Sequence, residues 1–231
     1  QGEGAMADKL YMHPNHFREK HLFKKPVSLV MAKHMPALQV LFRVLCKAKD
    51  SAQLHMITLG EWLDFFRGID VFRGDMTERK GTLCFSWSRS IVDDDTTDKG
   101  AVMDGCLPFD GFVEALGRMA VLTIMPTDNE LADAGYDVKE DSPSSAGIFL
   151  YNLVKFQQAR YEQLAELDRT EWGDAPRRQP IERRLTHLLS IIWYAIANQR
   201  QAAYGYGKAF AQECAGTAPG VMVEIDRYLQ G

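Results

Sequence analysis

The chain has 231 residues, of which 46% are hydrophobic, 25% charged and 10% aromatic. Its 27 Lys and Arg residues stand against 31 Asp and Glu residues, so the net charge is −4. These values indicate a compact globular protein with a sizeable core. They exclude a coiled-coil rod, a disordered chain and the broad positive field of a non-specific nucleic-acid-binding protein.

The first 25 residues are expected to form a polar N-terminal arm, 1–25. Gln1 to Ala5 precede Met6 and are typical of a cloning remnant, and they contain no apolar signal-peptide core. Three histidines in the arm have a spacing that fits no zinc motif, so we expect no metal there. They are His13, His16 and His21.

Neither a membrane span nor a disulfide framework is predicted. The longest uncharged apolar run, Leu188–Ala197, is shorter than the roughly 20 residues that a membrane helix needs. The cysteines form no CxxC pair and have apolar neighbours, which favours buried reduced thiols in a cytoplasmic protein. They are Cys46, Cys84, Cys106 and Cys214.

Apolar residues at helical spacing predict a first long helix over Pro26–Lys49. Pro36 lies within this segment. Because its ring would clash with the preceding turn, we expect the helix to break near His34.

The next segments alternate between short extended and helical patterns. Ile57–Leu59 is predicted to be extended, and helical spacing resumes over Glu61–Phe72. Thr77 is the predicted N-cap of a helix over Glu78–Ile91. The acidic stretch Asp93–Gly105 is typical of a solvated loop.

Another helix is predicted over Phe109–Ile124, in which Glu114 and Arg118 would form a surface ion pair. Thr127–Glu130 has the spacing of a capping box and predicts a short helix that Gly135 closes.

Residues 137–145 contain three serines and a proline and form the best candidate linker. They would separate a helical domain, 26–136, from a C-terminal helical subdomain, 145–231. In the second part, long helical patterns cover Ile148–Trp172 and Pro180–Arg200, and shorter ones complete the chain. The whole chain is therefore predicted to be all-α.

Two similar blocks give the most specific signal. Ile57–Phe66 and Leu107–Leu116 each place a β-prone apolar residue before an amphipathic helix. The pattern resembles the EF-hand family, in which two helix–loop–helix units pair through a short strand in each loop. The resemblance covers residues 36–125 and implies that the first residues of the two blocks pair. More loosely, Leu83–Ser88 and the acidic turn after it resemble EF-hand-related domains of protist cytoskeletal and flagellar proteins.

Calcium binding in that family needs oxygen ligands at loop positions 1, 3, 5 and 7 and a bidentate Glu at position 12. With Ile57 as the eighth residue of the loop, Asp50 and Glu61 would be the first and last ligands. Ala52 and Leu54 replace the ligands between them, and glycines replace both end carboxylates in the second loop. We therefore expect a degenerate, calcium-independent pair held by apolar packing, without a cofactor and with Glu61 on the surface.

An alternative is a calcium-binding sensor that uses the acidic 93–104 loop outside the family's register. Like charges repel one another when no metal is bound, which favours a solvated loop instead. The candidate ligands are Asp93, Asp95, Asp98 and Asp104.

The predicted function is a non-enzymatic protein-interaction or scaffold module, and the resemblance implies a cytoskeletal or flagellar assembly. An open EF-hand pair would bind an amphipathic helix of another protein in its apolar cleft. Alternatively, the chain's own C-terminal helices fill the cleft. No nucleic-acid partner is expected. The candidate protein-binding residues are Trp62, Phe65, Phe66, Trp87 and Phe112, with a small basic patch of Arg177, Arg178, Arg183 and Arg184.

A second alternative is a hydrolase-type enzyme whose Asp, His and Cys residues come together from distant segments. The sequence contains no Gly-x-Ser-x-Gly motif and no phosphate-binding loop. No catalytic residue is therefore predicted.

Overall fold

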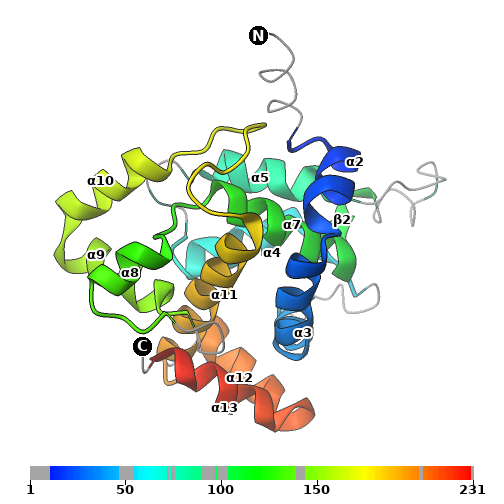
Figure 1. The fold of residues 1–231 in the computed structure, drawn as a ribbon. Coiled ribbons are helices and arrows are strands. Elements are labelled where there is room, and N and C mark those ends of the chain that lie inside the picture. The colour runs from blue at the N-terminus through cyan, green and yellow to red at the C-terminus, as the bar shows by residue number, and fades with distance from the viewer. Residues whose placement is uncertain are drawn as a thin grey trace.

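The structure is a computed structural model that describes residues 11–46, 55–71, 73, 76–89, 97, 104–138, 144–202 and 205–229. The fold is essentially all-α, as predicted (Figure 1). A pair of two-residue strands interrupts the helices.

The described part of the N-terminal arm is packed against the core and does not project as a polar arm. It forms helix α2 (Pro14–Phe17) and the π-helical turn η1 (Arg18–Leu22). Phe17 is fully buried, and Leu22 is 7% exposed. The prediction of a polar arm was wrong because these apolar side chains cover helix α7 (Phe109–Leu122), where Gly117 lies against both of them.

Helix α3 (Lys25–Cys46) runs through Pro36 without the predicted break. Proline removes one backbone N–H and strains the preceding turn. Buried side chains on both sides of it, including Met31 and Leu38, hold the helix against the core. Tertiary packing therefore outweighs the local cost.

By length and composition, α3 is also the one helix in the described ranges that could cross a membrane. A core helix passes the same test, and 56% of the relevant window is buried inside the structure. Its packing in the described fold is that of a core helix.

The first strand, β1 (Ile57–Thr58), leads directly into helix α4 (Leu59–Gly68). Thr58 and Glu61 form a capping box, in which each side chain accepts a hydrogen bond from the other residue's backbone N–H. Helix α5 (Glu78–Ser86) follows, with Thr77 as its N-cap as predicted.

The second strand, β2 (Cys106–Leu107), precedes α7 and pairs with β1 in antiparallel orientation. Ile57 lies opposite Leu107, and Thr58 lies opposite Cys106. The predicted pairing of the two similar blocks is thus present. It joins two helix–strand–helix units, α3–β1–α4 and α5–β2–α7.

Helix α8 (Asp128–Asp133) begins with the predicted capping box at Thr127 and Glu130, and Gly135 follows it at φ 86°. The single helix predicted over Ile148–Trp172 is instead two helices, α9 (Ala146–Phe156) and α10 (Gln158–Asp168). The backbone leaves the helical region at Gln157, where φ is −139° and ψ is 53°.

Helix α11 (Ile181–Asn198) is the central element of the C-terminal part, and Pro180 precedes it as the N-cap. Helices α12 (Tyr206–Thr217) and α13 (Pro219–Asp226) and a short 3₁₀ turn, η2 (Arg227–Leu229), complete the described chain. Figure 1 shows α11 passing through the middle of the molecule.

The core does not divide at the predicted linker. One continuous hydrophobic cluster contains side chains from α2 to α13, so α11–α13 share a core with both helix–strand–helix units. A smaller cluster lies between α8, α9 and α10, around Phe149 and Leu153. The described helices therefore form one body with a satellite, α8–α10, at its side.

Candidate functional site

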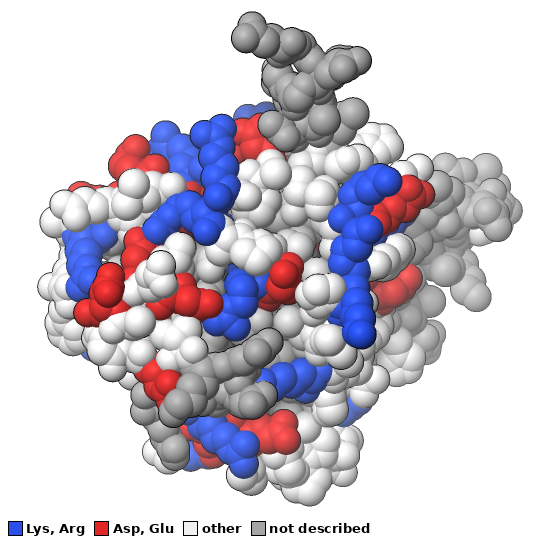
Figure 2. Space-filling view, in the orientation of Figure 1, with Lys and Arg blue, Asp and Glu red and all other residues white. Residues whose placement is uncertain are grey.

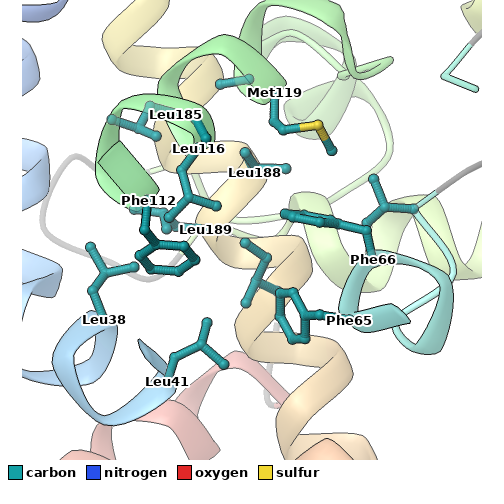
Figure 3. Packing of buried hydrophobic residues seen from close by; sticks show 14 of the residues in the cluster. Leu38, Leu41, Phe65, Phe66, Phe112, Leu116, Met119, Leu185, Leu188 and Leu189 are labelled. Atoms are coloured by element: carbon teal, nitrogen blue, oxygen red, sulfur yellow. The ribbon is translucent and has the colours of Figure 1, made fainter. Parts of the chain in front are cut away.

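The predicted apolar cleft is filled by the chain itself. Phe65, Phe66 and Phe112 are fully buried, and Figure 3 shows them around α11 in the core. Leu185, Leu188 and Leu189 of α11 are fully buried in the same hydrophobic cluster as these three rings. The chain's own helix α11 therefore covers these aromatic side chains within the described residues.

Trp62 is likewise fully buried, and its indole Nε1 donates to the carbonyl oxygen of Gly81 over 3.0 Å. The expectation of a binding surface was therefore wrong for four of the aromatic candidates, because their side chains are buried in the core. They are Trp62, Phe65, Phe66 and Phe112. Trp87 alone among the aromatic candidates reaches the surface, with 36% exposure.

The four arginines do not form a basic surface patch. Arg184 is fully buried, where it donates to the backbone carbonyls of Ala120 and Thr123 and to the Asp168 carboxylate at 2.8 Å. Arg178 pairs with Glu130, and Arg183 with Asp128, each at 2.6 Å. Arg177 is exposed. Three of these four charges are thus balanced within the fold.

Glu61 is buried and not on the surface as predicted. Its Oε2 accepts from Thr58 N at 2.8 Å, so the carboxylate caps α4. The expected surface pair of Glu114 and Arg118 is also buried, and Arg118 stacks over the Phe17 ring at 4.4 Å. The Glu61 carboxylate thus caps a helix and the Glu114 carboxylate pairs with a buried arginine.

The alternative cation site cannot be assembled from the part of the chain that the structure describes. Asp93, Asp95 and Asp98 lie outside the described residues. Asp104 instead accepts hydrogen bonds from Arg89 through its backbone carbonyl, at 2.7 Å, and its carboxylate, at 3.2 Å. Within the described ranges, His, Cys, Asp and Glu side chains form no group of three that could hold a metal.

A pocket of about 350 Å³ opens between the helix–strand–helix units and the satellite helices. Its lining comes from the end of α4 and the segment after it, from the two residues just after α7, and from α9, α10 and α11. The sequence did not reveal it, because its walls come from five separate segments. Its lining includes Ile69, Val71, Met76, Leu150, Tyr151, Tyr161, Ile191, Tyr194 and Ala195.

The pocket carries balanced charges. Its two charged lining residues, Asp70 and Arg73, form an ion pair with each other. Burial lowers the pKa of Arg73 and raises the pKa of Tyr194, so burial disfavours the charged form at both positions. Such a surface favours a largely apolar, uncharged group.

The size of the pocket restricts what it can hold. Ligand sites usually enclose about 300–1,000 Å³ and combine an apolar lining with a few polar groups. At the lower end of that range, this pocket suits one or two large side chains or a small organic molecule. The Tyr151 and Tyr194 rings, whose centroids are 5.5 Å apart, offer faces for stacking.

A second polar feature lies at the start of α9. Ser144 Oγ is 2.6 Å from His187 Nδ1, and His187 Nε2 is 3.3 Å from Asp128 Oδ1, although this second contact lacks hydrogen-bond alignment. His187 is fully buried, which lowers its pKa. The pKa of Asp128 is lowered to about 2, mainly by the neighbouring His187 and to a smaller extent by Arg183.

Ser144, His187 and Asp128 follow the order of a Ser–His–Asp triad with the two ring nitrogens exchanged, since Ser144 contacts Nδ1 and Asp128 lies nearest Nε2. Ser144 Oγ also accepts from Ala146 N over 3.3 Å. Sequence reasoning missed the cluster because 43 residues separate Ser144 from His187.

The cysteines are poor nucleophiles in this structure. All four are buried and unpaired with one another, as expected. Burial raises the pKa of Cys46 and Cys84 to about 12 and that of Cys214 to about 11. The thiolate form that would attack a substrate is therefore scarce near neutral pH.

Comparison of the chain with protein-family models, with curated proteins and with solved structures finds no match.

Proposed function

We propose that the protein is a calcium-independent protein-interaction module, built on a degenerate EF-hand-like pair whose cleft α11 fills. The antiparallel contact of Ile57 with Leu107 supports the pair. The burial of Leu185, Leu188 and Leu189 supports the view that α11 fills the cleft.

The observation that carries the proposed binding function is the apolar pocket beside α11. Its paired charges leave an uncharged apolar group as the best occupant, and its size suits an anchoring side chain of a partner segment. An aromatic or branched side chain would stack on Tyr151 or Tyr194. The partner is thus a protein segment with one dominant apolar anchor.

A peptide-display selection against the purified chain tests this function. Ala195→Trp would fill the pocket, and Ala215→Trp adds the same side chain at an exposed position of α12 as the matched control. We expect selected peptides to share a large apolar residue at one position. They should bind the control as tightly as the unmodified protein and the filled variant at least tenfold more weakly.

Thermal unfolding of both variants establishes first that each is folded, and Val154→Trp provides a second way to fill the pocket. Selected peptides that bind all forms equally would contradict the proposal. So would a selection that yields no peptide with an apolar anchor.

The cytoskeletal or flagellar setting is part of the same proposal and rests on the sequence resemblance to EF-hand-related domains of such assemblies. Fluorescence imaging of the tagged chain in its source cell tests it. A diffuse signal that detergent extraction removes would contradict it.

A second candidate function is a serine hydrolase, which the contacts of Ser144, His187 and Asp128 favour. Ser144 Oγ would attack an ester carbonyl while its proton passes to His187. The ester C–O bond then breaks, the leaving alcohol takes that proton, and water hydrolyses the acyl-serine.

A fluorophosphonate probe distinguishes this candidate from a purely structural network. The hydrolase would be labelled at Ser144, and Ser144→Ala would abolish the label. Ser86→Ala is a control on a serine outside the cluster. Equal labelling of the unmodified protein and Ser144→Ala would exclude the serine hydrolase.

A further inference from the structure

The junction between η1 and α3 has an exposed face that the proposed function does not use. Lys20, Phe23, Lys24 and Lys25 are exposed in or beside the turn that joins the two elements. Figure 2 shows Lys and Arg side chains in a column over the part of the molecule where η1 and α3 lie in Figure 1. We name this surface the lysine face and define it by Lys20, Phe23, Lys24, Lys25, Leu29 and Lys33.

Helix geometry places the rest of the lysine face on one side of α3. Lys25 and Leu29 are one turn apart, and Lys33 follows one turn later, so all three point away from the core. Val27 and Met31, on the opposite side, are buried. The inner side therefore anchors α3 to the body while the outer side stays free.

The lysine face is positive although the chain as a whole is negative. Residues 19–33 contain four lysines and one acid, Glu19, whereas the chain has a net charge of −4. Among the ion pairs of the described ranges, none involves Lys20, Lys24, Lys25 or Lys33. These four charges are free to attract an anionic surface.

Two large apolar side chains lie among these lysines. Phe23 is 68% exposed and Leu29 is 61% exposed. Single exposed apolar residues are common, but two of them flanked by lysines form the pattern of a helix that lies in a membrane interface. Lysine stems extend along such a boundary while their ammonium groups reach the headgroups.

We propose that the lysine face docks the protein peripherally on an anionic lipid surface. Lysines would contact anionic headgroups, and Phe23 and Leu29 would insert at the boundary with the acyl chains. Nucleic acid would satisfy the charges but offers no apolar phase, and an acidic protein would need a matching apolar groove for both side chains, whereas a membrane interface accepts them without one. Because the inner side of α3 remains buried, the helix lies on the membrane and does not cross it.

Co-sedimentation with vesicles tests the proposal. The full chain is mixed with vesicles of phosphatidylcholine alone or of phosphatidylcholine with phosphatidylserine, at low and at high salt. We expect binding to the anionic vesicles that weakens at least tenfold at high salt, and little binding to neutral vesicles.

Two variants separate the charges from the apolar side chains. Lys20→Gln/Lys24→Gln/Lys25→Gln should lose at least tenfold in vesicle affinity, and Phe23→Ser/Leu29→Ser should lose a similar factor. Val223→Ser, at a residue that is 62% exposed on α13, and Lys208→Gln are matched controls that should bind normally. Unchanged unfolding midpoints show that the variants are folded.

Equal binding to neutral and anionic vesicles would overturn the proposal, as would binding that the lysine substitutions leave unchanged. Retained affinity in Phe23→Ser/Leu29→Ser would also overturn it, because the surface would then be a purely electrostatic site. A fluorescent DNA duplex included in parallel should bind more weakly than the anionic vesicles, and tighter DNA binding would contradict the lipid assignment.

Discussion

His34 lies in the core beside Trp193, whose indole Nε1 donates to His34 Nδ1 over 3.2 Å. That hydrogen bond needs the neutral imidazole, because a protonated Nδ1 cannot accept. Burial lowers the pKa of His34 from 6.5 to about 4. His21, lowered to about 4, and His187 are shifted in the same direction by burial.

These shifts predict acid sensitivity. Between pH 6.5 and about 4 the unfolded chain binds more protons than the folded chain, so the free energy of unfolding falls as the pH is lowered. His34 contributes up to about 1.4 kcal/mol per pH unit in this window. Urea unfolding at a series of pH values measures the slope, and His34→Gln should make it shallower. An unchanged slope in that variant would contradict the assignment.

Arg184 is a buried arginine that holds three parts of the fold together. Its guanidinium contacts the Asp168 carboxylate and two backbone carbonyls, and both charged side chains are almost completely buried. These contacts join α11 to the end of α7 and to α10.

Arg184→Met should destabilise the fold by about 3–5 kcal/mol, because it leaves Asp168 as a poorly compensated buried charge. Arg183→Met, on the neighbouring residue, removes a partly exposed pair with Asp128 and should cost less than about 1 kcal/mol. Denaturant unfolding of both variants compares them. Similar costs would show that Asp168 is not held by Arg184.

At the scale of elements, the contact of α9 with α11 is unusually close. A Cβ atom at Gly147 would lie 2.6 Å from Tyr194 Cβ and 2.7 Å from the Ser190 carbonyl oxygen. Since a backbone atom cannot move aside easily, only glycine fits this crossing.

Gly147→Ala is therefore expected to cost about 1–3 kcal/mol through overpacking. Gly216→Ala, in α12, is the matched control, because nothing lies within 4 Å of its added Cβ. That change should be neutral or stabilising by up to about 1 kcal/mol. Thermal unfolding measures both, and a harmless Gly147→Ala would mean that α9 and α11 are farther apart.

Elements with local signals could be predicted from the sequence. Thr77 and Thr127 were recognisable N-caps, and the two blocks before α4 and α7 indicated the strand pair. Continuity of α3 through Pro36 was not predictable, because distant side chains supply the compensating burial. The break between α9 and α10 at Gln157 was not predicted either, because Ile148–Trp172 has apolar residues throughout.

The candidate site was much less predictable than the fold. Phe65, Phe66 and Phe112 were recognised as an apolar set, but their burial depends on α11, which begins 69 residues further along the chain than Phe112. The pocket beside α11 has no sequence signal, because its walls meet only after the helices pack. Nothing in the sequence distinguished Arg184, which is buried, from the neighbouring arginines.

For the whole molecule, apolar packing accounts for the arrangement of the helices. The large core cluster connects both helix–strand–helix units to α11–α13, so apolar contacts set the angles between helices. The Glu61 carboxylate caps α4, a role that needs no metal. We therefore propose, as the central claim, that the fold sets its helix angles without a bound ion.

The unfolding midpoint with saturating calcium and with a chelator tests that claim most directly. A ligand that binds only the folded state raises the midpoint, and the increase grows with its concentration. We expect the two midpoints to coincide, in the unmodified protein and in Glu61→Gln. A midpoint that rises with calcium in the unmodified protein and not in Glu61→Gln would contradict an ion-independent fold.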